Sequence, residues 1–234
     1  MGDAMLLQRL GAAGVVAFLR AAVKTRQMVR AIQACAAIIR IQDVADHVAV
    51  HHASGASTLV DALDAWPNDV TLNQACLCAL FHAWGGGVAP FDDGTAVPTE
   101  RIVLAIVSSV HRHPTELYTC QAACRLFKLF TASESKLLQL PAVVNAVGVA
   151  MTNFPSDDSV HHWGATTLCH IHIHTDKSGI VDAHGGHSYA AIVTKTLQLA
   201  ASAKRPTTVF VAGVAWDHSI ATQLAQPPVI EAEM

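Results

Sequence analysis

The sequence contains few charged residues, and no apolar run in it is long enough to cross a membrane. Only 14% of the 234 residues are Asp, Glu, Lys or Arg, whereas 52% are hydrophobic. A disordered chain has the opposite signature of low hydrophobicity and high net charge, so we expect a folded protein with a buried core. The longest apolar runs, residues 11–19 and 142–151, fall short of the roughly 18–20 residues that span a bilayer, so we expect no membrane span.

The sequence also lacks the short motifs that identify several common enzyme classes. It contains no Gly-x-x-x-x-Gly-Lys loop for phosphate, no Gly-x-Ser-x-Gly nucleophile elbow and no His-Glu-x-x-His zinc motif. The adjacent acids Asp157 and Asp158 begin an expected helix, where negative charge stabilises the helix dipole without any catalytic role. We therefore expect no enzymatic activity and no cofactor.

Six cysteines occur without a secretory leader pattern at the start of the sequence, which favours reduced thiols over a disulfide framework. Cys35 and Cys76 follow Ala at matching places, which is typical of close helix packing in a core. For Cys120 and Cys124, one helical turn apart, a redox pair is the alternative to packing. We expect a cytoplasmic protein. A nuclear location is one alternative, and a mitochondrial location is another because residues 4–40 are basic, like a presequence.

Charge is distributed unevenly along the chain. Residues 1–42 contain six basic residues and one acid, whereas residues 43–100 contain eight acids and neither Lys nor Arg. Nucleic acid requires a continuous basic surface, so we do not expect it as a partner. The two oppositely charged segments suggest a further hypothesis, a homo-oligomer that forms through its charge-asymmetric ends.

A repeated proline motif divides the sequence into similar units. An aromatic or basic residue, a proline and short polar residues follow one another at 66–69, 113–116, 154–157 and 205–208, and the prolines are 47, 41 and 51 residues apart. Proline ends a helix, and the polar side chains that follow can cap the next one. Each motif therefore predicts a helix–turn–helix joint.

Apolar segments with helical periodicity lie on both sides of each joint. The expected helices before the joints are 15–22, 59–66, 102–110, 142–151 and 190–200. The expected helices after the joints are 26–41, which has no proline before it, 72–84, 117–130, 160–173 and 209–220. A period of this size is typical of helical solenoids, in which units stack because none can bury its apolar face alone.

Several of these segments resemble the armadillo repeat. Residues 180–186 (Ile-Val-Asp-Ala-His-Gly-Gly) and 10–16 look like the turn after its first helix, and the Gln-Ala motifs at 33, 74 and 121 look like its third helix. The resemblance implies an all-α fold, a right-handed α-solenoid (α-α superhelix) in one domain, 1–234. About five armadillo-like repeats are expected, at 4–42, 43–84, 99–131, 134–175 and 178–225, with a tail at 226–234. HEAT-like, two-helix geometry is expected where 85–98 and 131–140 replace the short first helix.

Armadillo proteins bind extended peptides in a groove lined by their third helices, so the resemblance implies a non-catalytic scaffold or adaptor whose partners are proteins or peptides. Nuclear-import adaptors of this family clamp basic peptides with repeated Trp and Asn pairs. Here one Trp and no Asn match, so we do not expect that activity. The groove residues implied by this alignment are Arg40, Leu77, Phe81, Arg125, Leu129, Thr166, His170 and Trp216. This mixture suits an apolar or acidic segment better than a lysine-rich one.

A histidine cluster at residues 161–174 supports an alternative function. His170 and His174 would lie one turn apart on a helix and could supply two of the four ligands of a structural zinc site. The competing interpretation is a solvated helix edge that contains some core histidine. A structural subunit of a larger assembly is the remaining alternative.

Overall fold

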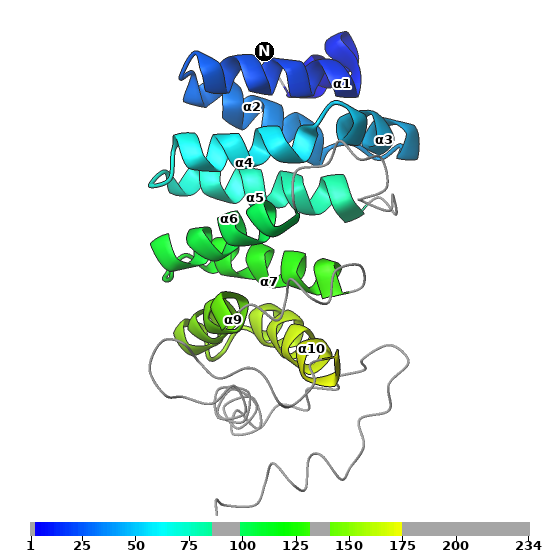
Figure 1. Cartoon of the computed structure of the whole chain (residues 1–234). Coiled ribbons are helices and arrows are strands. Elements are labelled where there is room, and N and C mark those ends of the chain that lie inside the picture. The colour runs from blue at the N-terminus through cyan, green and yellow to red at the C-terminus, as the bar shows by residue number, and fades with distance from the viewer. Residues whose placement is uncertain (1–2, 86–98, 132–140, 175–234) are drawn as a thin grey trace, which may run out of the picture.

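The computed structural model describes residues 3–85, 99–131 and 141–174, and over these ranges the chain is entirely helical (Figure 1). The described ranges contain α1 (Asp3–Lys24), α2 (Met28–Ile39), α3 (Val44–His52), α4 (Gly55–Ala65), α5 (Val70–Gly85), α6 (Thr99–Arg112), α7 (Leu117–Thr131), α9 (Pro141–Asn153) and α10 (Asp158–His174). The expected all-α class is confirmed for this part of the chain. None of these helices is long and apolar enough to cross a membrane.

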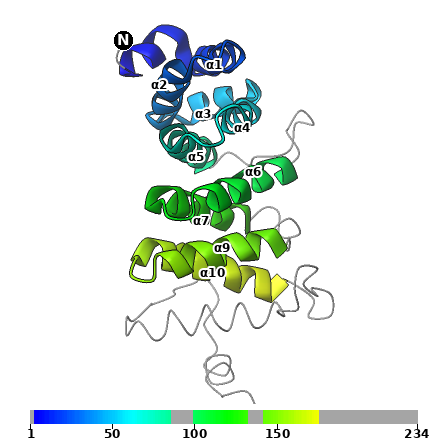
Figure 2. The same ribbon diagram turned by 90° about the vertical axis from the view of Figure 1, so that its left-hand side faces the viewer.

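The helices pack in two rows. In one row, here the α1–α9 row, α1, α4, α6 and α9 each contact the next helix in that order. In the other, here the α2–α10 row, α2, α5, α7 and α10 do the same. Figures 1 and 2 show the resulting stack, which runs from α1 at one end to α9 and α10 at the other. The short helix α3 packs against α1, α4 and α5.

The proline joints at 66–69, 113–116 and 154–157 share one turn. In each, the backbone N–H of the fourth residue donates to the carbonyl oxygen of the first, at 3.1 to 3.2 Å. Asp69 Oδ1 then accepts from the Leu72 N–H at 2.7 Å, and Asp157 Oδ1 accepts from the Val160 N–H at 2.8 Å, which caps α5 and α10. The predicted role of these three prolines is confirmed, while the motif at 205–208 lies outside the described residues.

The first joint turns without a proline. Arg26 adopts a left-handed φ of 54°. The N–H of Gln27 donates to the Ala22 carbonyl at 2.9 Å, and the N–H of Arg26 donates to the Val23 carbonyl at 3.1 Å. This is the Schellman arrangement that commonly ends helices and usually uses glycine at the left-handed position. Here arginine occupies that position.

Side chains near successive joints also bind the carbonyl oxygens of a neighbouring joint. Three such bonds are present: Arg26 Nη1 to the Ala65 carbonyl, His113 Nε2 to the Pro67 carbonyl at 3.0 Å, and Asn153 Nδ2 to the Pro114 carbonyl at 2.9 Å. Because a carbonyl oxygen can only accept, the second bond places the His113 proton on Nε2. These bonds connect the helix pairs along one edge of the stack.

The first two helix pairs each contain a short helical segment before the first long helix. Gly11, with φ 66°, interrupts α1 within the expected junction at 10–16. Ser54, with φ 60°, separates α3 from α4. The next residue, Gly55, fits closely, because a Cβ there would lie 2.5 Å from Val50 Cγ1 and 2.8 Å from the Val50 carbonyl oxygen. The other expected junction, at 180–186, lies outside the described residues.

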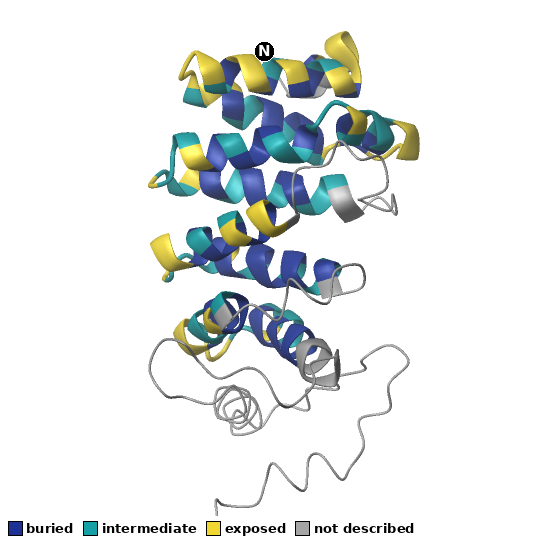
Figure 3. Ribbon diagram, in the orientation of Figure 1, coloured by how far each residue is buried: buried dark blue, intermediate teal, exposed yellow. Residues whose placement is uncertain are grey.

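The core lies between the two rows and between successive pairs. Buried residues are concentrated along α5 and α7, whereas exposed residues lie chiefly on α1 and at helix ends (Figure 3). Cys35 and Cys76 are fully buried, and their Sγ atoms are 3.7 Å apart where α2 meets α5. The expected packing role of these two cysteines is confirmed. The predicted fifth unit at 178–225, the tail at 226–234 and most of segments 85–98 and 131–140 lie outside the described residues.

Candidate functional site

The described groove residues differ in how far they reach the surface of the α2–α10 row. Arg40 follows the last residue of α2 and is exposed. Phe81 on α5 and Arg125 and Leu129 on α7 are half-buried. His170 belongs to α10, but its side chain is outside the described residues, as is the whole of Trp216. Three of these four positions, Phe81, Arg125 and Leu129, therefore lie on the adjacent helices α5 and α7.

Two of the predicted groove residues lie in the core instead. Leu77 has no exposed surface. Thr166 is 6% exposed, and its hydroxyl donates to the His162 backbone carbonyl at 2.7 Å. Leu77 has no surface to offer a partner and Thr166 has very little, so the predicted groove is corrected at both positions.

The correction at Leu77 is a shift of one residue. The acidic residue of each joint, Asp69 or Glu116, provides a common origin for counting along α5 and α7. Cys78 and Arg125 lie equally far from these origins, whereas Leu77 lies one residue nearer. Cys78 is half-buried, so it takes the place that the sequence interpretation gave to Leu77.

Two cations of α7 each face an aromatic ring of a neighbouring helix. Arg125 Cζ lies 6.0 Å from the centre of the Phe81 ring on α5. Lys128 Nζ lies 5.7 Å from the centre of the Trp163 ring on α10. Both distances are within the range of a cation–π interaction. These four residues and Cys78 lie on the adjacent helices α5, α7 and α10 and are here called the basic-aromatic surface.

The charge of Arg125 influences the thiol beside it. Burial raises the pKa of the Cys78 thiol, the positive charge of Arg125 acts to lower it, and Cys35 acts to raise it. The net shift is upward, so Cys78 is protonated at neutral pH. Arg125 Nε is buried and has no hydrogen-bond partner within the described ranges, and no described carboxylate pairs with this guanidinium.

Acidic residues are almost absent from the α2–α10 row. Among α2, α5, α7 and α10, only the first residue of α10, Asp158, is acidic. The neighbouring acid Asp157 precedes that helix, and both of its carboxylate oxygens accept from Gln121 Nε2, at 3.1 and 3.0 Å. The basic-aromatic surface therefore carries positive charge with little negative charge from its own helices.

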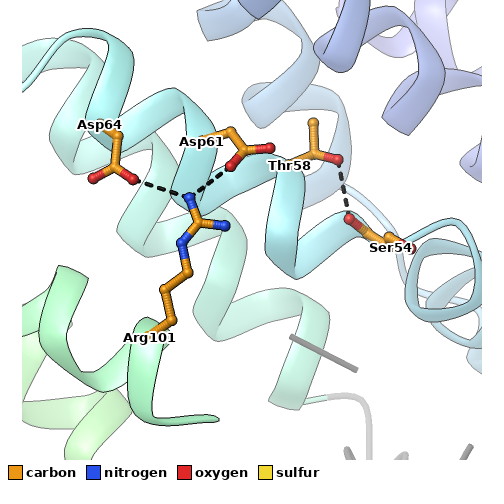
Figure 4. Close-up of polar contacts among 5 residues, drawn as sticks. All are labelled: Ser54, Thr58, Asp61, Asp64 and Arg101. Carbon is orange, nitrogen blue, oxygen red and sulfur yellow. Dashed lines mark hydrogen bonds and ion pairs between the residues drawn. The ribbon is translucent and has the colours of Figure 1, made fainter. Parts of the chain in front are cut away.

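A hollow of about 340 Å³ lies on the α1–α9 row, between α4 and α6. Arg101, in its lining, donates to Asp61 at 2.7 Å and to Asp64 at 3.0 Å (Figure 4). These hydrogen bonds raise the pKa of the Arg101 guanidinium. Arg101 is thus paired with two acids and connects α4 to α6, so the hollow is a weaker candidate than the basic-aromatic surface.

The side chains that the structure describes do not form a ligand set for the predicted metal site. Within those residues, no three or more His, Cys, Asp or Glu side chains converge as a metal site requires. His161 is 6% exposed, with both ring nitrogens buried and without a hydrogen-bond partner in the described part. The side chains of His170, His172 and His174 lie outside the described residues, so the predicted pair His170 and His174 stays a prediction.

The surroundings of Cys120 and Cys124 disfavour the reactive thiolate that a redox pair needs. Both thiols are buried. Burial raises the pKa of Cys120 to about 11, with a further contribution from Glu116, and burial also raises the pKa of Cys124. Because the thiolate is the reactive form, these two residues suit packing better than redox chemistry.

Sequence reasoning missed three members of the site: Cys78, Lys128 and Trp163. Counting nine residues from the acidic residue of a joint reaches Cys78 and Arg125, but the same count from Asp157 reaches the buried Thr166, so this count alone does not identify exposed positions. Lys128 and Trp163 meet because α7 and α10 pack side by side, and no local sequence signal records that contact.

Comparison of the chain with models of known protein families, with characterised proteins and with solved structures finds no significant match.

Proposed function

We propose that the chain is an armadillo-like α-solenoid of about five repeats that acts as a non-catalytic scaffold and binds segments of other proteins on its α2–α10 row. Three features support the architecture. The helices stack in two rows, the joints share one turn, and side chains connect successive joints. The short segments ahead of α4 and within α1 agree with the three-helix armadillo unit rather than with the two-helix HEAT unit.

The observation that carries the binding role is the basic-aromatic surface. Arg and aromatic residues are enriched among the residues that dominate protein–protein binding energy. Phe81 and Trp163 are half-buried, so their rings are held in place and yet retain area that a partner can cover. A preformed surface of this kind loses little conformational entropy when a partner binds.

Photo-cross-linking from defined positions tests this proposal. A photoreactive phenylalanine analogue is introduced at Cys78 on the basic-aromatic surface or, as the matched control, at Leu104 on α6. Leu104 is 43% exposed and belongs to the opposite row. Full-length protein is irradiated in cells, and the adducts are identified by mass spectrometry.

We expect discrete protein adducts from position 78 that disappear when Phe81 and Trp163 are replaced by alanine, and no matching adducts from position 104. The proposal fails if position 78 forms no adduct, or if both positions form the same adducts. It also fails if the adducts from position 78 survive the two alanine substitutions in a protein that keeps its helical content.

A further inference from the structure

We infer that the segment bound on the basic-aromatic surface is acidic, and that two of its carboxylates bind Arg125 and Lys128 while apolar neighbours contact Phe81 and Trp163. The inference rests on the proposed function and adds the chemistry of the partner. Three observations support it: the excess of basic over acidic residues in the α2–α10 row, the Nε of Arg125 that has no partner among the described residues, and the spacing of Arg125 and Lys128.

The charge of the α2–α10 row favours a negative partner. Its four helices contain the basic residues Arg30, Arg125 and Lys128 and the single acid Asp158. Asp158 lies in the first turn of α10, where it complements the helix dipole. Complementary charge across an interface steers association and excludes partners of the wrong sign.

Arg125 has bonding capacity that the described residues leave unused. Its Nε is buried without a hydrogen-bond partner, and the ring of Phe81 faces its guanidinium. A partly desolvated charge without a counter-ion is unfavourable. A carboxylate from outside supplies that counter-ion, and its charge-assisted hydrogen bonds are about twice as strong as neutral ones.

The positions of the two cations suggest the spacing of the acids. Arg125 and Lys128 are three residues apart on one helix, so their Cβ atoms are about 5–6 Å apart. In an extended segment, alternate side chains point to the same side, and each residue advances the chain by about 3.3 Å. Two acids separated by one residue therefore match Arg125 and Lys128, and the rings of Phe81 and Trp163 lie beyond the cations on either side.

A protein segment fits this surface better than a nucleic acid. Nucleic-acid binding depends on many phosphate contacts. The described helices of the row supply three Lys or Arg residues, and Arg30 lies on α2, where its guanidinium is 6.0 Å from the Phe18 ring of α1. Two adjacent cations flanked by rings match a short acidic and apolar peptide.

Peptide selection on the full-length chain tests the inference. A random 12-residue library displayed on phage is selected against the wild-type protein and, separately, against the double variant Arg125→Glu, Lys128→Glu. Synthetic copies of the enriched peptides are then titrated by fluorescence anisotropy. The titrations use wild type, each single charge reversal and the control Arg112→Glu, which reverses an exposed charge at the end of α6. If the Arg125→Glu variant does not fold, Arg125→Met replaces it in the titrations, because methionine retains the apolar stem and removes the charge.

Wild-type protein is expected to enrich peptides with two acids separated by one residue and apolar residues beside them. Each charge reversal should weaken binding about tenfold or more, because a charge-assisted hydrogen bond is lost and repulsion is added, while Arg112→Glu should leave the affinity unchanged. The double variant should enrich basic peptides.

Three results would overturn the inference, and they differ in what they say about the proposed function. Enriched peptides without acids that are lost with Phe81→Ala and Trp163→Ala would refute the acidic partner but retain the binding surface. Peptides insensitive to every substitution on the surface would refute both. Tighter binding of a 12-nucleotide oligouridine than of any enriched peptide would replace the protein segment with RNA.

Discussion

Single residues of the basic-aromatic surface differ chemically from their counterparts in the core, and the five described cysteines show this most clearly. Cys35, Cys76, Cys120 and Cys124 are buried, whereas Cys78 is half-buried and close to the positive charge of Arg125. Access and nearby positive charge both favour reaction of a thiol. The reactivity of the native Cys78 thiol can therefore be used to probe the basic-aromatic surface without any substitution.

Of these five cysteines, Cys78 should be alkylated first when native protein is treated with iodoacetamide. Peptide mass spectrometry at increasing reaction times measures the order. Arg125→Met should slow the reaction at Cys78, because the positive charge that acts to lower its pKa is lost. Faster modification of Cys76 or Cys120 would contradict the burial described above.

His82 makes stability depend on pH. Its pKa is lowered from 6.5 by burial and, to a smaller extent, by the charge of His47 on α3. The unfolded chain therefore binds a proton at this residue at a higher pH than the folded chain does. The free energy of unfolding should fall as the pH drops below about 6.5 toward the lowered folded-state pKa, and it should not change through this group at higher pH.

Thermal melts of wild type and His82→Gln between about pH 7.5 and about pH 5 measure this effect. The wild-type melting temperature should fall more steeply on acidification than that of the variant. Equal slopes for the two proteins would show that His82 does not contribute. His47 is buried with an unpartnered Nδ1 in the described part, so His47→Gln provides a comparison on the facing helix.

The register of the site shows the limit of prediction at this scale. Leu77 and Cys78 could not be ranked from the sequence because α5 has apolar residues on almost all of its faces. Periodicity then cannot tell the buried side from the exposed one. Asp69 caps the start of α5, and counting from the joints places Cys78 level with Arg125.

At the scale of elements, the joints were predictable because each depends on local chemistry. Proline and the fixed turn explain where α4, α6 and α9 end, and the acidic caps Asp69 and Asp157 mark where α5 and α10 begin. The short helix α3 was not predicted as a separate element. Its nine residues are weakly amphipathic, and its start is marked only by Asp43, whose Oδ1 accepts from the Ala45 N–H at 2.7 Å.

The acidic caps should matter for stability in a graded way. Asp157→Ala removes the cap of α10 and the bonds from Gln121, so the free energy of unfolding should fall by about 1–2 kcal/mol. Asp69→Ala removes a cap alone and should cost about 1 kcal/mol. Asn68→Ala, at an exposed position in the same turn, should change stability by less than about 0.5 kcal/mol.

Urea denaturation followed by circular dichroism gives these differences from the transition midpoints. A loss at Asn68 equal to that at Asp69 would show that the turn tolerates no change and that capping is not the cause. A neutral Asp157→Ala would contradict the hydrogen bonds assigned to this carboxylate.

At the scale of the whole molecule, two arginines of the basic N-terminal segment bind other parts of the same chain. Arg20 donates to the Ala53 carbonyl at 2.7 Å, and Arg26 donates to the Ala65 carbonyl, so each binds a free carbonyl at the end of a helix in the next pair. The sequence showed the charge asymmetry but not these targets. A homo-oligomer through charge-asymmetric ends stays a prediction.

The contacts between side chains of different helices could not be predicted from the sequence. The repeat predicted that units would stack, because each leaves an apolar face uncovered. It could not predict which side chains of α7 would meet which rings of α5 and α10, because those contacts depend on the offset between neighbouring helices. The pairs of Arg125 with Phe81 and of Lys128 with Trp163 come from the three-dimensional arrangement alone.

A crystal structure of the full-length chain with an enriched acidic peptide is the most direct measurement of the central claim. It should show the peptide lying across α5, α7 and α10, with its carboxylates within hydrogen-bond distance of the Arg125 guanidinium and the Lys128 ammonium group. A peptide bound in the hollow between α4 and α6, or helices that do not stack in two rows, would contradict the account.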